Sequence, residues 1–347
     1  MKITSLIIVF FIGTASCFLP SCTAIISRKT QTTHLMKNDA GIESIDIYRK
    51  KSQSMFQLIR PENILPTAVI NVVGGWIINP SLSLFSTPQF YASILITQLV
   101  MVNSMILNDL FDYKTDKINN PDRPLVSGAI TKREAISSAI AIFLLSEIVN
   151  AFFIVKQLRI ITHFANAISL LYTPLLKRIF FVKNISCATM ISLGMFFSGI
   201  TAYTPFMVIE RGRVNLWMIA TRFMFMGSLY VELLLDITDI SGDKKSNIHT
   251  IPIVFGKKWS WHIASALLHG NLIFSTLDIM RMSDFRTGMY FILICIPLMK
   301  DLLYIREFAY SNKVIRRVVK NTTIPMIIAL LYLCLISVYR ISVYTGM

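Results

Sequence analysis

The sequence predicts an all-α, polytopic membrane protein, because the chain is strongly apolar, carries little charge and is divided into long apolar stretches. Of its 347 residues, 54% are hydrophobic and only 15% are charged, whereas an ordinary soluble domain has about 25% charged residues. The formal net charge of +15 favours contact with anionic membrane lipids or anionic substrates. We expect no nucleic-acid partner, because the basic residues lie between apolar runs and do not form one stripe.

The first 37 residues have the composition of a targeting presequence. Lys2 precedes a short apolar run that ends in small residues, which is the pattern of a secretory signal. The stretch that follows is basic and rich in hydroxyl side chains, and no acidic residue occurs before Asp39, as in a transit peptide. The junction at residues 15–20 also resembles the presequence junction of algae with secondary plastids.

We therefore expect residues 1–37 to be a presequence that leads to a plastid membrane. Residues 38–57 are expected to form an amphiphilic juxtamembrane segment, and residues 58–347 the membrane domain. The alternative is an uncleaved signal anchor in the endoplasmic reticulum or another endomembrane.

Nine stretches after Arg60 approach the length of about 20 apolar residues that a membrane-spanning helix needs. Pro or charged residues lie at most of the breaks between them, as helix ends require. The expected spans are residues 63–83, 89–111, 134–155, 160–176, 181–203, 214–236, 259–280, 287–305 and 322–342.

The distribution of basic residues supports nine spans. The segment before the first span and the links after the even-numbered spans carry 24 Lys and Arg, whereas the links after the odd-numbered spans before the last carry six. Positive charge collects on the cytoplasmic side of membrane proteins. The amino terminus is therefore expected on the positive side of the membrane, with the carboxyl terminus opposite.

Two short acidic segments follow the second and sixth expected spans, and so both lie on the positive side. On a helix, residues spaced by three or four positions share one face. The residues that share a face are Asn108, Asp112 and Asp116 in the first segment, and Asp236, Asp239 and Asp243 in the second.

Like charges crowded at the mouth of a low-dielectric site repel one another unless a cation holds them. Oxygen ligands without His or Cys suit Mg²⁺, which binds through one or two carboxylates and substrate phosphates. The predicted magnesium ligands are Asn108, Asp109, Asp112, Asp116, Asp236, Asp239 and Asp243. The alternative is that both segments are solvated helix ends.

Basic and amide side chains on the same side complete a site for a diphosphate, since Arg and Lys neutralise the phosphate oxygens that the metal leaves free. The predicted diphosphate-binding residues are Arg60, Asn63, Arg123, Lys177, Arg178 and Lys244. For each cation, the alternative is an anchor to lipid headgroups.

Residues 55–342 resemble the UbiA superfamily of intramembrane prenyltransferases. The stretch from Asn108 to Gly128 resembles the first Asp-rich motif of that family, and the stretch from Asp236 to Gly256 resembles the second. The resemblance implies a UbiA-type bundle of nine transmembrane helices. It also implies Mg²⁺-dependent transfer of a polyprenyl group from an isoprenyl diphosphate donor to a lipophilic acceptor in the membrane.

The resemblance assigns catalysis to four carboxylates, Asp112, Asp116, Asp239 and Asp243, and it supports a substrate-binding role for Tyr172. The first motif is most similar to that of digeranylgeranylglyceryl phosphate synthases. This favours a geranylgeranyl donor and geranylgeranylglyceryl phosphate as acceptor. The second motif is also similar to chlorophyll synthases and homogentisate prenyltransferases, which leaves chlorophyllide or an aromatic acceptor as alternatives.

A membrane transporter is the alternative from another class of protein, because charged side chains inside spans can line an ion path. Arg222 and Glu232 lie inside the sixth expected span and keep this alternative open.

Overall fold

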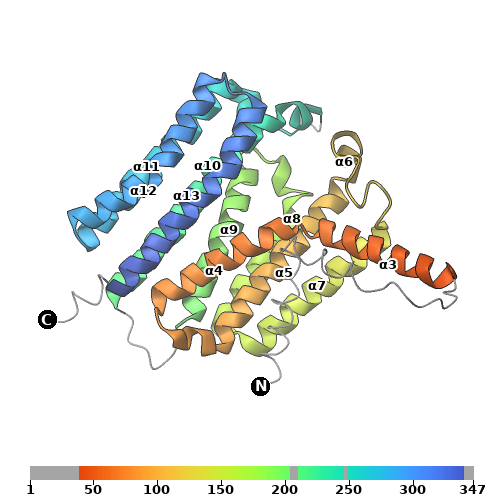
Figure 1. Ribbon diagram of the computed structural model, residues 1–347, viewed down its shortest axis with the longest axis horizontal. Helices are drawn as coiled ribbons and strands as arrows, with labels where there is room; N and C mark the ends of the chain where they lie inside the picture. The colour runs from red at the N-terminus through yellow and green to blue at the C-terminus, as the bar shows by residue number, and fades with distance from the viewer. Residues whose placement is uncertain (1–38, 204–209, 246–247, 340–347) are drawn as a thin grey trace, which may run out of the picture. The chain divides into compact units, whose positions relative to one another are not determined.

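The computed structural model describes residues 39–203, 210–245 and 248–339, and this part of the chain is helical with no strand (Figure 1). The predicted presequence, residues 1–37, lies outside the described residues. The chain divides into a short unit that ends at Arg49 and a large unit that begins at Lys50. The boundary falls within helix α3 (Asp39–Leu58), which covers most of the predicted juxtamembrane segment.

Each of the nine expected spans coincides with one helix of the large unit. The helices are α4 (Ile64–Ile78), α5 (Pro88–Phe111), α7 (Lys132–Phe153), α8 (Arg159–Tyr172), α9 (Val182–Thr201), α10 (Arg211–Lys245), α11 (Ile251–Met282), α12 (Phe285–Glu307) and α13 (Asn312–Tyr339). Seven of them, all but α4 and α8, are long and apolar enough to cross a membrane within the described residues. An integral, multi-pass membrane protein is therefore supported, whereas nine full spans are not established.

Helices α4 and α8 have only 15 and 14 residues, so the spans expected at 63–83 and 160–176 were too long. Pro80 follows the end of α4 and Pro174 follows the end of α8. Proline has no backbone N–H to donate, and its ring disfavours a helical conformation in the residue before it. Both helices therefore end where apolar residues still continue.

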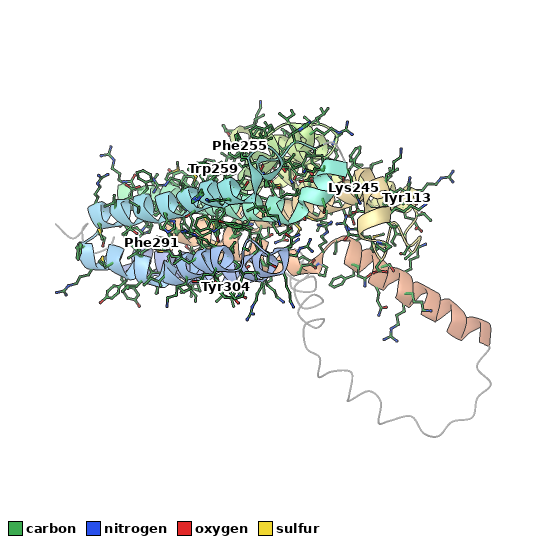
Figure 2. The ribbon with its side chains drawn as sticks, turned by 90° about the horizontal axis from the view of Figure 1, so that it is seen from above. Tyr113, Lys245, Phe255, Trp259, Phe291 and Tyr304 are labelled. Atoms are coloured by element: carbon green, nitrogen blue, oxygen red, sulfur yellow. The ribbon has the colours of Figure 1, made fainter. Side chains whose placement is uncertain are left out.

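Helix α10 lies at the centre of the packing, in contact with α9, α11 and α13. The fully buried side chains of Tyr230 and Phe223 lie on it, and the ring of Phe223 meets Phe291 of α12 edge to face at 5.4 Å. Figure 2 shows Phe291 among the side chains between these helices. Helix α5 packs against α7, α8 and α9, and α4 packs against α9.

Glycines allow α9 to approach both α4 and α10 closely. A Cβ atom on Gly74 of α4 would lie 2.3 Å from the carbonyl oxygen of Met195. A Cβ atom on Gly199 of α9 would lie 2.1 Å from Nε1 of Trp217 on α10. Small residues of this kind are typical of helix interfaces in membranes, where close backbone approach supplies the packing.

The two acidic segments differ in their backbone. Helix α5 ends at Phe111, Asp112 has non-helical angles (φ −82°, ψ 4°), and a short helix, α6 (Tyr113–Asn119), begins after it. The expected unbroken helical stripe through the first segment is therefore wrong. Helix α10, by contrast, runs unbroken for 35 residues through the whole second segment, roughly 50 Å at the rise of an α-helix.

Tyr113, at the start of α6, and Lys245, at the end of α10, lie toward the same end of the helices, away from Phe291 (Figure 2). The fold thus brings the two acidic segments together.

Candidate active site

A cavity of about 1120 Å³ lies among α4, α5, α8, α9 and α10, and both acidic segments line it. Eleven of the predicted site residues line this cavity: Arg60, Asn108, Asp112, Asp116, Arg123, Tyr172, Lys177, Arg178, Asp236, Asp239 and Asp243. Three predicted site residues do not line it: Asn63, Asp109 and Lys244. We call the charged end of this cavity, where the acidic segments meet, the mouth.

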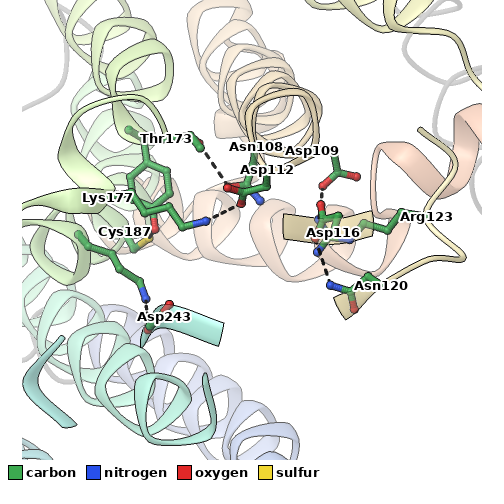
Figure 3. Close-up of polar contacts among 12 residues, drawn as sticks. Asn108, Asp109, Asp112, Asp116, Asn120, Arg123, Thr173, Lys177, Cys187 and Asp243 are labelled. Carbon is green, nitrogen blue, oxygen red and sulfur yellow. Dashed lines mark hydrogen bonds and ion pairs between the residues drawn. The ribbon is translucent and has the colours of Figure 1, made fainter. Parts of the chain in front are cut away.

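The first acidic segment is held by residues that follow α8. Lys177 lies in a short 3-10 helix, Leu176–Arg178, and its Nζ donates to Asp112 Oδ2 at 2.5 Å. Thr173, which ends α8, donates to the side-chain oxygen of Asn108 at 3.3 Å. These contacts fix the end of α5 against the end of α8, and the side chains face one another across the mouth (Figure 3).

Arg123 connects the first acidic segment to the loop after it. Its guanidinium donates to Asp109 Oδ1 at 2.9 Å and also pairs with Asp116, which accepts a further bond from Asn120 at 3.1 Å (Figure 3). Arg60 donates to the same oxygen of Asp109 at 2.8 Å. Asp109 is only 4% exposed. It therefore lies behind the cavity wall, where it positions two arginines that line the cavity.

The second acidic segment is held from the start of α9. Lys183 Nζ donates to Asp236 Oδ1 at 2.6 Å and lies 3.8 Å from Asp243 Oδ2, while Asn184 donates to Asp236 Oδ2 at 2.8 Å. Asp236 is only 1% exposed. Asp239 is exposed and lies 3.5 Å from an Nη atom of Arg316.

Sequence reasoning missed Lys183 and Asn184 as site residues. Lys183 was counted only among the charges that orient the protein in the membrane. The available signal was a Lys–Asn pair at the start of the fifth expected span, on the same side as both acidic segments.

The donors at the mouth are carboxylate and amide oxygens, which is the chemistry that Mg²⁺ prefers. The Oδ2 atom of Asp243 is buried without a hydrogen-bond partner, so it has an acceptor position to offer. Within the described residues no three carboxylate, His or Cys side chains converge on one point. The donor set therefore suits a metal that is held jointly by single carboxylates and a phosphate ligand, which is the usual mode of Mg²⁺.

Below the mouth the cavity becomes mainly apolar. Its inner walls include Ile96, Val100, Ile161, Met190 and Phe197. Thr97, which lines the deep part, and Asn108 at the mouth are eleven positions apart, or about 16 Å along the helix. A charged mouth above an apolar pocket suits an amphiphile with an anionic head and a hydrocarbon tail.

Residues 68–317 match the sequence model of the UbiA prenyltransferase family. The chain belongs to this family. It is therefore a prenyltransferase, as the resemblance of the two acidic motifs predicted.

Relatives of the chain include archaeal proteins named digeranylgeranylglyceryl phosphate synthase. The one from Saccharolobus solfataricus is 30% identical over 65% of this chain and 77% of its own length, and the one from Sulfolobus acidocaldarius is 28% identical over the same shares. The one from Methanosphaera stadtmanae is 34% identical, but over only 44% of this chain and 52% of its own length.

Solved structures share the fold. One, determined in work on digeranylgeranylglyceryl phosphate synthase in membranes, has a TM-score of 0.62 and 20% identity, covering 83% of this chain and 99% of its own. A UbiA homologue from Archaeoglobus fulgidus bound to GPP and Mg²⁺ has a TM-score of 0.53 and 18% identity, covering 81% of this chain and 98% of its own.

Family membership argues against the transporter alternative. Of the two charged side chains that kept it open, Arg222 pairs with Asp278 of α11 at 2.8 Å and does not line the cavity. Glu232 does line the cavity.

Proposed function

We propose that the protein transfers a geranylgeranyl group from geranylgeranyl diphosphate to geranylgeranylglyceryl phosphate, in a Mg²⁺-dependent reaction within a membrane. The observation that carries this proposal is the single cavity that joins two acidic segments and their cations to an apolar pocket. The similarity to archaeal digeranylgeranylglyceryl phosphate synthases supports this choice of donor and acceptor.

The leaving diphosphate needs positive charge at the mouth, because negative charge grows on it as the allylic carbon–oxygen bond lengthens. Three cavity-lining cations form no ion pair with any described carboxylate: Lys114, Arg178 and Lys245. These side chains are free to bind the phosphate oxygens of the donor and the acceptor. The predicted phosphate ligands Arg60, Arg123, Lys177 and Arg178 line the cavity, and Lys114 and Lys245 are added to this proposal. Lys244, which was also predicted, does not line the cavity.

Bound Mg²⁺ would add Lewis-acid stabilisation of the leaving diphosphate. The residues that would hold it are Asn108, Asp112, Asp116, Asp236, Asp239 and Asp243. The apolar inner walls would bind the isoprenoid chain and exclude water, which would otherwise capture the electron-deficient carbon.

The test uses the purified protein in lipid nanodiscs with radiolabelled geranylgeranyl diphosphate. Geranylgeranylglyceryl phosphate, chlorophyllide and an aromatic acid compete as acceptors at equal concentration, with Mg²⁺ or with EDTA. We expect the glycerol phosphate to give the highest kcat/KM, and EDTA to abolish transfer. Full turnover in EDTA contradicts the metal requirement. A tenfold preference for another acceptor, about 1.4 kcal/mol of transition-state free energy, contradicts the proposed acceptor.

Delivery to a plastid membrane stays a prediction. The archaeal relatives do not support it, and the support is the composition of residues 1–37. A fluorescent protein fused to this segment should enter the plastid of a suitable algal host. Retention in the endoplasmic reticulum favours the signal anchor.

A further inference from the structure

Glu232 is the acidic side chain of the cavity to which the proposed function gives no role. It lies on α10, one helical turn before Asp236, and so on the same helix face but deeper in the cavity. Among the acidic side chains of the described residues that line the cavity, Glu232 alone forms no ion pair. Lys183 is close enough to influence the charge of Glu232 but is ion-paired with Asp236. A carboxylate inside a membrane protein that has no ion pair of its own is costly, which makes a functional role the first hypothesis.

The side chains next to Glu232 lie where the charged mouth of the cavity meets its apolar pocket. Its carboxylate lies next to the thiol of Cys187, and Cys187 Sγ donates to the hydroxyl oxygen of Tyr172 at 3.1 Å. All three side chains line the cavity. When a donor lies with its diphosphate at the mouth and its tail in the pocket, the first carbon of the prenyl chain falls at this boundary.

We infer that the Glu232 carboxylate is the general base of the reaction and takes the proton of the acceptor's hydroxyl group. This inference rests on the proposed function. The hydroxyl oxygen forms a bond to the first prenyl carbon as the bond from that carbon to the diphosphate breaks. The bonding pair leaves with the diphosphate, and the hydroxyl proton passes to Glu232, so that an ether, diphosphate and protonated Glu232 result. The proton then leaves to solvent through the mouth.

The negative charge of the Glu232 carboxylate also favours some acceptors over others. An alcohol must lose a proton and gains from a carboxylate beside it. An acceptor that attacks through a carboxylate, as in chlorophyllide esterification, has no proton to lose and is repelled by a second carboxylate in a water-poor site. Glu232 therefore favours an acceptor that loses a proton, such as the glycerol-type acceptor, over one that attacks through a carboxylate.

The test compares wild type with Glu232→Gln, which keeps the shape of the side chain and removes its basic oxygen. We expect kcat for transfer to a hydroxyl acceptor to fall about a hundredfold or more, the usual contribution of general base catalysis, with KM for geranylgeranyl diphosphate unchanged. Glu232→Asp should retain part of the activity. The matched control is Glu147→Gln, another acidic side chain of a spanning helix, which pairs with His163 outside the cavity and should leave kcat unchanged.

Two further measurements separate a general base from a structural residue. A thiol analogue of the acceptor, which loses its proton far more readily than an alcohol, should restore much of the rate in Glu232→Gln. The variant should also release more free prenyl alcohol per transfer, because slower attack by the acceptor leaves the bound donor exposed to water for longer.

The inference is overturned if Glu232→Gln keeps the kcat of the wild type. It is also overturned if kcat of this variant falls by the same factor with the hydroxyl acceptor and with the thiol acceptor. Absence of any transfer by the wild type contradicts the proposed function itself, so the two failures are distinguishable.

Discussion

At the scale of single residues, the mouth is a set of carboxylates that are already neutralised by the protein's own cations. Asp112 forms an ion pair with Lys177, Asp236 with Lys183, and Asp116 with Arg123. In a low-dielectric site such pairs compensate the cost of burial only where the geometry is good. Most of the carboxylates thus already have a partner before substrate enters.

Asp239 offers the cleanest test of the predicted catalytic carboxylates, because it is exposed and its removal leaves no buried charge unpaired. We expect Asp239→Asn to fold normally and to lower kcat by a factor on the order of a hundred to a thousand, as when one stabilising group is removed from a transition state. Asp112→Ala should lose activity as well, but it also deprives Lys177 of its partner. Asp122→Asn, an exposed loop residue outside the cavity, serves as control, and an unchanged kcat in Asp239→Asn contradicts the assignment.

Asp109 should behave differently from the carboxylates that line the cavity. Because it accepts from both Arg60 and Arg123 while buried, Asp109→Ala leaves two guanidinium groups without this partner. Breaking a buried pair costs on the order of 3 kcal/mol, so we expect a clearly lower unfolding temperature in detergent. A normal unfolding temperature together with abolished activity would instead support the predicted role of Asp109 as a metal ligand.

At the scale of helices, small residues decide how closely the elements of the site approach. Gly74 lets α4 pack on α9, and the oxygen of Met195 that a Cβ atom there would meet also accepts from Trp217 Nε1 at 3.3 Å. This contact joins α4, α9 and α10, three of the helices that surround the cavity.

We therefore expect Gly74→Ala to destabilise the protein by about 1–3 kcal/mol, the usual cost of overpacking. The matched control is Gly270→Ala on α11, where the nearest side-chain atom lies 4.0 Å from the new Cβ and where alanine is the better helix former. The measurement is thermal unfolding of both variants in the same detergent. Equal effects of the two substitutions contradict the close contact between α4 and α9.

Sequence periodicity predicted the helices well, because apolar length and charged or proline breaks are local properties. It placed α5 at 89–111 and the observed helix is Pro88–Phe111. It did not predict the backbone break at Asp112, because no Gly or Pro occurs there. Nor did it predict that Lys183 pairs with Asp236, 53 positions along the chain, since such a pairing depends on how α9 packs against α10.

At the scale of the whole molecule, the orientation in the membrane follows from the side on which the basic residues lie. With the native cysteines replaced, Ser127→Cys and Ser81→Cys place single thiols at exposed positions, in the links that follow α5 and α4. We expect an impermeant maleimide to label them from opposite sides of sealed vesicles. Labelling of both from one side contradicts the assignment of α5 as a membrane crossing. Ser246, another candidate for labelling, lies outside the described residues.

Helix α10 is much longer than the hydrocarbon core of a bilayer, which is about 30 Å thick. At this length it can carry its acidic end into the headgroup layer while the apolar pocket stays at the depth of the acyl chains. Two lipid substrates can then reach the enzyme by lateral diffusion, and neither tail has to pass through water. Collision becomes a two-dimensional event, so the rate follows the mole fraction of each substrate in the bilayer. Added inert lipid would slow the enzyme even when the bulk concentrations of enzyme and substrates stay the same.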